Sequence, residues 1–280
     1  MPISVRIGSR EVGAGHPTFV VAEVGINHGG SVETAKRLIE AAAKSGADAV
    51  KFQTYRTEKR VSRESPIFDI LKQCELDEAA HHEVVRVARD VGISFFSTPF
   101  DPESVELLAS LDVPAYKIAS FDIVNLALIR AATSKRRPLI VSRGMADAGE
   151  IDRAVEVMER AGVHYILLHC VSAYPLKPED ANLRMIATLQ RRYTCPIGYS
   201  DHTIGIEVPV LAVAAGACAV EKHFTLDRAM PGPDHALSAD PKDLQAMVER
   251  IRVIEPILGR GEIRRLESEQ AILPYRRPSA

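Results

Sequence analysis

The sequence predicts an α/β protein whose main part is a single (β/α)8 TIM barrel with a short N-terminal extension. Eight short runs rich in β-branched residues alternate with longer amphipathic stretches, which is typical of a parallel sheet covered by helices. The alternation covers about 240 residues, a length that suits one closed barrel. No GxGxxG motif follows the first run, although a doubly wound dinucleotide-binding sheet would usually carry one.

The eight predicted strands and the eight predicted helices follow one another in strict alternation. The strands are expected at residues 18–25, 49–54, 94–99, 115–119, 138–142, 165–170, 196–200 and 219–225. The helices are expected at residues 31–45, 77–91, 102–111, 126–134, 150–161, 183–191, 206–215 and 241–258. The first helix illustrates the boundaries, because Ser31 is a good N-cap and Gly46 a good terminator.

The chain divides into three parts around this barrel. Residues 1–17 are expected to form an N-terminal hairpin or plug, residues 18–259 the catalytic barrel and residues 260–280 a peripheral C-terminal tail. The segment 55–76 is too long for an ordinary connection and is rich in basic residues. It is either a substrate-covering loop or a solvated charged excursion.

Composition excludes several classes of partner. The formal net charge is −2 with both signs intermixed, so no basic surface for nucleic acid or an anionic membrane is expected. The N-terminus has no apolar signal region, and no apolar run reaches the length of about 18 residues that a membrane span requires. We therefore predict a cytoplasmic protein with small-molecule partners.

Polar side chains gather where the predicted strands end, which in this barrel class is the position of the active site. They are Glu23, Lys51, Gln53, Thr98, Lys117, Ser120, Ser142, Ser172, Tyr174, Ser200, His202, Glu221 and His223. Because side chains alternate along a strand, Lys51 and Gln53 share one face of the barrel wall.

Two lysines in otherwise apolar strands indicate an anion site. An isolated buried ammonium is very costly, so Lys51 and Lys117 each need an anionic partner. Together with the nearby serine and threonine hydroxyls they could form a phosphate cradle. The alternative is that each lysine pairs with an internal carboxylate such as Glu23 or Glu221.

Two histidines near the ends of neighbouring strands indicate a metal site. His202 and His223 could hold one divalent ion through their ring nitrogens and leave positions open for substrate and water. The alternative is a pair of hydrogen-bonded structural histidines. His81 and His82 lie in a predicted surface helix and are expected to be solvated.

Six ordered blocks of the sequence resemble a known family. The stretch VVAEVGINHGGSVETAKRLIEAAAKSGADAVKFQTY resembles the opening of the N-acetylneuraminate (sialic acid) synthases, which include pseudaminic, legionaminic and spore-coat sugar enzymes. The blocks FFSTPFD, YKIASFDIVN, LLHCVSAYP, GYSDHTIG and VEKHFTLDRAMPGPDH extend the resemblance over residues 19–258.

The resemblance implies a reaction and a role for each site residue. The reaction is condensation of phosphoenolpyruvate with an open-chain amino-sugar aldehyde, similar to N-acetylmannosamine, to give a sialic-type nonulosonic acid and phosphate through C–O cleavage. Phosphoenolpyruvate would be held by Lys51, Thr98, Lys117, Ser120, Ser142 and Ser200. Mn²⁺ or another divalent metal would be held by His202 and His223, with Glu23 as the catalytic carboxylate and Gln53, Tyr174 and Asp234 contacting the sugar.

The chain departs from the family pattern at several positions. Ser172 stands where the sialic acid branch usually has Asn, and Arg143 stands where Thr is common. Arg143 either adds a cation beside the phosphate site or points outward. Family members usually continue into an antifreeze-like domain, whereas this sequence stops at Ala280. This leaves three alternatives: the sequence is truncated, the barrel works without that domain on a different aldehyde, or a separate antifreeze-like domain protein supplies it as a partner. A homodimer, which in the family depends partly on that domain, and a monomer are both compatible with the sequence.

Two other functions are compatible with the same residues. The chain could be a different phosphoenolpyruvate aldol synthase that acts on another, phosphorylated aldose, which would require a second anion site. It could also be a non-catalytic barrel that binds a sugar acid. The charged groups kept at the barrel mouth argue against the second function, since a barrel without activity has no need of them.

Overall fold

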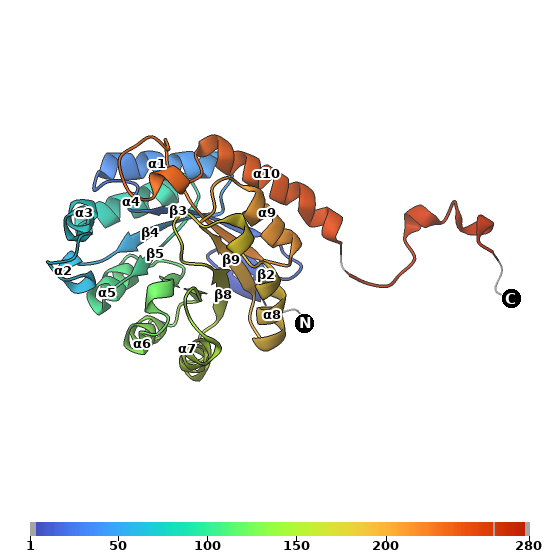
Figure 1. Ribbon diagram of the computed structural model, residues 1–280, viewed down its shortest axis with the longest axis horizontal. Coiled ribbons are helices and arrows are strands. Elements are labelled where there is room, and N and C mark those ends of the chain that lie inside the picture. Colours follow the sequence, from blue (N-terminus) through green and yellow to red (C-terminus); the bar gives the residue numbers. More distant parts are fainter. Residues whose placement is uncertain (1–3, 260, 278–280) are drawn as a thin grey trace.

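A closed barrel of eight parallel strands forms the centre of the molecule (Figure 1). The computed structural model describes residues 4–259 and 261–277 of the chain. Within them the barrel strands are β3 (Phe19–Gly25), β4 (Ala49–Thr54), β5 (Ser94–Pro99), β6 (Tyr116–Ile118), β7 (Leu139–Ser142), β8 (Tyr165–Cys170), β9 (Ile197–Asp201) and β10 (Ala219–His223). Each strand pairs with the next, and β10 closes the barrel against β3. The predicted (β/α)8 fold is confirmed.

Helices surround the barrel as an outer layer (Figure 1). They are α1 (Val32–Lys44), α4 (Glu78–Asp90), α5 (Pro102–Ser110), α6 (Leu126–Ser134), α7 (Ala148–Arg160), α8 (Arg184–Arg192), α9 (Glu207–Ala214) and α10 (Pro241–Leu258). Side-chain N-caps begin most of them, including Ser31 for α1 and Asp147 with a capping box for α7. The main core lies between this layer and the strands, where residues such as Leu38 and Leu108 are fully buried.

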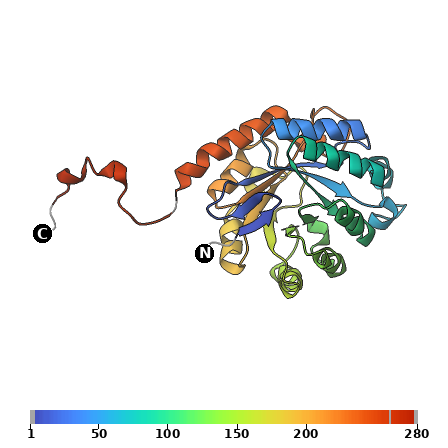
Figure 2. The same ribbon diagram turned by 180° about the vertical axis from the view of Figure 1, so that it is seen from behind.

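An N-terminal hairpin closes the end of the barrel opposite to the strands' carboxyl ends. It consists of β1 (Ser4–Ile7) and β2 (Arg10–Gly13), which pair antiparallel (Figure 2, dark blue). Its apolar side chains Val5, Ile7 and Val12 join the barrel interior in a second hydrophobic cluster. Residues 1–3 of the predicted hairpin or plug lie outside the described residues.

The segment predicted as a long loop contains two short helices. These are α2 (Thr57–Arg60) and α3 (Phe68–Cys74), which lie between β4 and α4. The sequence did not indicate them because each spans two turns or fewer, too short for a periodic apolar pattern. Tyr55 and Leu71 are buried in a small cluster beneath this segment.

The predicted C-terminal tail lies away from the barrel (Figure 1). Its residues 261–277 carry two single 3-10 turns, at Glu267–Glu269 and Leu273–Tyr275. Residues 260 and 278–280 of the tail lie outside the described residues. Among the helices of the described chain, none has the length and apolar character needed to span a membrane.

Candidate active site

A cavity of about 260 Å³ opens at the carboxyl ends of the barrel strands. The predicted site residues that line it are Glu23, Lys51, Gln53, Thr98, Lys117, Ser120, Ser142, Tyr174, Ser200, His202, His223 and Asp234. Parallel strands in register bring these side chains together, since Glu23 stands opposite both Lys51 of β4 and His223 of β10. The expected concentration of polar groups at this end of the barrel is therefore present.

Ser172 is the predicted residue that does not line this cavity. Its hydroxyl is buried and has no hydrogen-bond partner within the described chain. The Ser172 side chain packs against Gly144. A Cβ added at Gly144 would stand 2.5 Å from Ser172 Oγ and 2.7 Å from Ser120 Oγ. Gly144 thus lets the chain after β7 pass close to the serines, and the sequence analysis missed this position.

Two buried lysines form the floor of the cavity. Lys51 Nζ donates to Thr98 Oγ1 at 3.1 Å, and Lys117 Nζ donates to Ser142 Oγ at 2.7 Å. The same side chains are almost fully buried. Each ammonium therefore lies next to a hydroxyl. The two ammoniums and the two hydroxyls together can donate several hydrogen bonds to one anion.

Both lysines also pair with carboxylates of the barrel interior. Lys51 Nζ lies 2.8 Å from Glu23 Oε2 and 3.7 Å from Glu221 Oε1, while Lys117 Nζ lies 3.6 Å from Glu221 Oε1. Pairing of the lysines with Glu23 or Glu221 was the alternative to a phosphate cradle in the sequence analysis, and these pairs are observed in the structure. These ion pairs fix the positions of the two ammoniums at the floor of the cavity. Glu221 also accepts a hydrogen bond from the Ser200 hydroxyl at 3.0 Å.

The two carboxylates differ in their proton affinity. Burial raises the pKa of Glu23 to about 7, although Lys51 counteracts part of the rise. Burial also acts on Glu221, but Lys117 and Lys51 outweigh it and hold the pKa of Glu221 below its usual value. Glu221 therefore stays ionised at neutral pH, whereas Glu23 can take up or release a proton there.

The two predicted metal ligands lie side by side on the wall formed by β9 and β10. The ring centroids of His202 and His223 are 5.6 Å apart. His202 Nδ1 donates to the carbonyl of Val171 at 2.7 Å, so its Nε2 keeps a free lone pair. Burial lowers the pKa of both histidines, which keeps both rings neutral, as metal ligation requires.

The two histidines can supply two nitrogen ligands to a metal ion whose other ligands come from substrate or water. His223 Nδ1 is buried and has no hydrogen-bond partner in the described chain, and it lies 4.0 Å from the carboxylate of Asp234. No group of three or more His, Cys, Asp or Glu side chains among the described residues is arranged to hold a metal. An ion here would therefore use two histidines and complete its shell with substrate or water.

Arg60 also lines the cavity and was not among the predicted site residues. Its Nη1 donates to Gln53 Oε1 at 2.8 Å, and Gln53 Nε2 in turn donates to Glu23 Oε1 at 3.4 Å. The apolar side chains of Ile67, Ile70, Leu71 and Phe121 line the same cavity. The basic character of segment 55–76 was the available signal, but it did not distinguish Arg60 from its exposed neighbours.

The structure tests the predicted exposure of His81 and His82 and the predicted place of Arg143. His81 was expected to be solvated, and this is wrong, since it is buried with Nε2 2.9 Å from Thr54 Oγ1. His82 is exposed, as expected. Arg143 does not line the cavity, because its guanidinium nitrogens lie 3.2 and 3.3 Å from Nδ1 of the buried His169.

The fold and this cavity define a TIM-barrel protein whose charged and polar groups gather at the carboxyl ends of the strands, the usual place of the active site in this fold. The model of the NeuB family matches residues 38–263, and the chain belongs to that family. The resemblance seen in the sequence blocks is thereby confirmed, and the chain is an enzyme of this family of synthases.

Similar proteins support the assignment over almost the whole chain. An uncharacterized protein of Methanocaldococcus jannaschii is 47% identical over 98% of this chain and 82% of its own length. The N,N'-diacetyllegionaminic acid synthase of Legionella pneumophila is 40% identical over 95% of this chain and 80% of its own length. The crystal structure of an N-acetylneuraminic acid synthetase from Leptospira borgpetersenii, in complex with citrate, superposes with a TM-score of 0.96 at 41% identity, covering 98% and 96% of the two chains.

Proposed function

We propose that this enzyme condenses phosphoenolpyruvate with an open-chain N-acylamino-sugar aldehyde to give a nonulosonic acid and inorganic phosphate. The observation that carries the proposal is the cavity floor, where Lys51 and Lys117 each bring a hydroxyl within hydrogen-bond distance. Two ammoniums and several hydroxyls suit a ligand that bears both a phosphate and a carboxylate. The synthases among the similar proteins make acids of this class.

The proposed reaction forms one C–C bond and breaks one C–O bond. The methylene carbon of phosphoenolpyruvate attacks the aldehyde carbon, and the aldehyde oxygen takes a proton and becomes a hydroxyl. Water then adds to the carbon that bears the phosphate oxygen and releases a proton, and loss of inorganic phosphate leaves a keto group. Glu23 lines the cavity and burial raises its pKa to about 7, so it would accept the proton from that water.

A divalent metal such as Mn²⁺ is part of the proposal. His202 and His223 would hold it, and when bound it would polarise the aldehyde carbonyl. His223→Ala should reduce metal binding by isothermal titration calorimetry and should also remove the activity that a chelator abolishes in the parent enzyme. Tight Mn²⁺ binding that survives in His223→Ala would refute this role. His82→Ala, at an exposed helix position, is the matched control.

The proposal also places the enzyme in the cytoplasm, where phosphoenolpyruvate is produced. Cell fractionation with an antibody to the native protein checks this location.

The deciding experiment is an assay of phosphate release from phosphoenolpyruvate with Mn²⁺ and a panel of aldehydes. The panel contains N-acetylmannosamine, a diacetamido-trideoxyhexose, mannose and phosphorylated aldoses, and the product mass is read in parallel. Aldehyde-dependent phosphate release with a three-carbon gain in mass supports the proposal. Release with phosphorylated aldoses alone would favour the other aldol synthase, and phosphoenolpyruvate binding without release would favour a binding barrel.

A further inference from the structure

Arg60 carries donors that the protein itself does not use. A guanidinium has five N–H donors, and the structure shows one of them bonded, from Nη1 to Gln53 Oε1. Within the described chain, no carboxylate lies within 4.0 Å of this guanidinium. Yet the side chain lines the cavity and burial lowers its pKa, so it is partly withdrawn from water. A desolvated donor without an acceptor is costly unless a ligand supplies one.

The guanidinium is held in one orientation by two aromatic rings. Its central carbon lies 3.8 Å from the ring centroid of Phe100 and 4.6 Å from that of Tyr55. The two rings meet edge to face at 6.1 Å, and the Tyr55 hydroxyl donates to the carbonyl of Leu71. A stacked arginine loses little further side-chain freedom when it binds, which favours a specific directional contact.

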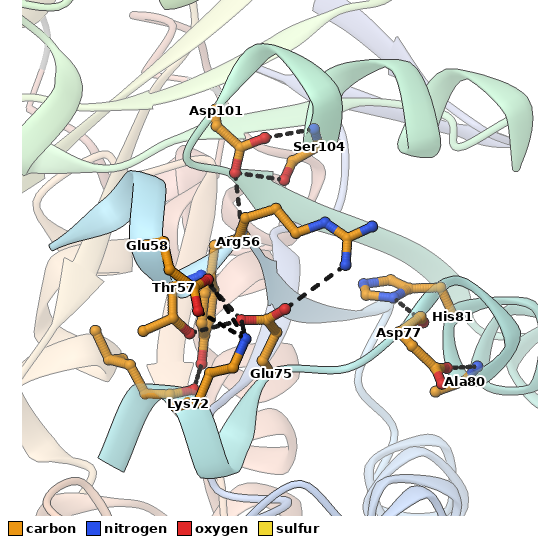
Figure 3. A network of polar contacts seen from close by, with 12 residues as sticks. Arg56, Thr57, Glu58, Lys72, Glu75, Asp77, Ala80, His81, Asp101 and Ser104 are labelled. Atoms are coloured by element: carbon orange, nitrogen blue, oxygen red, sulfur yellow. Dashed lines mark hydrogen bonds and ion pairs between the residues drawn. The ribbon is translucent and has the colours of Figure 1, made fainter. Parts of the chain in front are cut away.

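A polar network anchors the segment that carries Arg60 (Figure 3). The carboxylate of Glu75 accepts from the backbone N–H and the hydroxyl of Thr57, and from Lys72. On the other side, Asp101 accepts from the backbone N–H of Arg56. Helix α2 is thus tied to the C-terminal end of α3 and to the loop after β5, so the position of Arg60 is set by the fold.

The surroundings of Arg60 favour a neutral polar group over a second anion. The negative charges of Asp122, Asp234 and Glu23 all act on the guanidinium. They would repel a phosphate or carboxylate at this wall. Ile67 and Ile70 line the same cavity as Arg60 and offer apolar surface to a methyl group. An acylamino group has both features, a carbonyl acceptor and an apolar methyl.

We propose that Arg60 is a specificity-determining residue that donates hydrogen bonds to the carbonyl oxygen of the aldehyde's N-acyl group. The inference rests on the proposed function, because it names the part of the aldehyde that this wall recognises. The acyl methyl lies against Ile67 and Ile70, and phosphoenolpyruvate is held at the lysine floor. Arg60 therefore acts on the choice of aldehyde and leaves the affinity for phosphoenolpyruvate unchanged.

The test compares Arg60→Met, which keeps an apolar stem over the rings but has no donors, with the parent enzyme. The acylated probes are N-acetylmannosamine and a diacetamido-trideoxyhexose, and the probe without an acyl group is mannose. We expect the KM for the acylated probes to rise by about tenfold or more, the scale of a hydrogen bond to a charged group. The KM for phosphoenolpyruvate should change by less than about twofold, and the preference over mannose should fall by the same factor as the acylated KM rises.

Two further variants keep the test decisive. Arg63→Met removes a cation from an exposed position of the same segment and should change no kinetic constant. Arg60→Lys keeps the charge but loses the planar fork, so it should remain impaired. Full activity of Arg60→Lys, or an equal loss for mannose in Arg60→Met, would overturn the acyl contact. If Arg60→Met does not fold, Arg60→Lys alone decides.

Failure of the proposed function is a separate result. If the parent enzyme releases no phosphate with any aldehyde of the panel, the condensation reaction is refuted. Calorimetric binding of N-acetylmannosamine to the parent enzyme and to Arg60→Lys, in the presence of phosphoenolpyruvate, then still tests the acyl contact. Equal binding by the two proteins, or no binding by either, would refute it.

Discussion

At the scale of single residues, the two floor lysines have internal partners that the proposed phosphoenolpyruvate anion would replace. Lys117 Nζ lies between Ser142 and Glu221, and burial together with Lys51 lowers its pKa. A bound phosphate adds negative charge next to it and stabilises its charged form. We therefore propose that the side chains that form the internal ion pairs also form the phosphate cradle when phosphoenolpyruvate binds.

Lys117→Ala should weaken phosphoenolpyruvate binding by about 2–4 kcal/mol, because one partner of a buried charge-assisted contact is removed. Calorimetric titration with phosphoenolpyruvate measures this loss. Lys222→Met is the matched control, since Lys222 is equally buried but pairs with Asp201 at 2.6 Å and does not line the cavity. Equal phosphoenolpyruvate affinity in the parent protein and Lys117→Ala would disprove the cradle.

The pH dependence of the reaction should reflect Glu23. Its pKa is raised to about 7 by burial, so the carboxylate that accepts a proton is formed only as the pH rises through that value. We expect kcat/KM to increase from pH 6 to pH 8 and to level off above. Glu23→Gln should show much lower kcat/KM without this rise, whereas a limb that persists in Glu23→Gln would assign the titration to another group.

At the scale of elements, the segment with α2 and α3 forms the part of the cavity wall where we propose that the aldehyde binds. It was expected as a covering loop or as a charged excursion, and its outer residues, such as Lys59, do form exposed ion pairs. Its inner side carries Arg60 and the apolar side chains of α3. The segment packs closely against Gly30, which has a φ of +81°. A Cβ added at Gly30 would stand 2.0 Å from the carbonyl oxygen of Gln73, so a side chain here would displace the segment.

Glu75→Ala should loosen this segment, because the backbone N–H of Thr57 loses its acceptor and Lys72 loses an ion-pair partner. We expect a stability loss of about 1–3 kcal/mol and a higher KM for the aldehyde, with the KM for phosphoenolpyruvate unchanged. Hydrogen exchange of residues 56–75 and chemical denaturation measure the two effects. Glu58→Ala, which removes only an exposed partner of Lys72, should behave like the parent protein.

At the scale of the whole molecule, the N-terminal hairpin and the charged cavity lie at opposite ends of the barrel. The hairpin fills the amino-terminal end, where Ile7 is fully buried against the barrel interior. The charged cavity occupies the carboxyl-terminal end. This separation means that a packing defect at one end can lower stability while it leaves substrate binding at the other end intact.

Ile7→Ala should therefore destabilise the protein by about 2–5 kcal/mol, the usual cost of a large cavity in a core. Denaturant unfolding measures the loss, and the KM values should stay within about twofold of the parent enzyme at a temperature where the variant is folded. Arg6→Ala, at an exposed position of the same strand, is the control. A stability loss below about 0.5 kcal/mol in Ile7→Ala would show that the hairpin contributes little.

The order of strands and helices was determined by the sequence alone, because periodicity and capping are local properties that each segment carries by itself. Positions such as Lys51 and Glu221 could be assigned to the barrel mouth for the same reason, since a strand's carboxyl end is a local feature. The tertiary structure decided which charges meet. The Lys51 to Glu23 pair, the contact of Arg143 with His169 and the place of Arg60 join segments that only strand register and packing bring together.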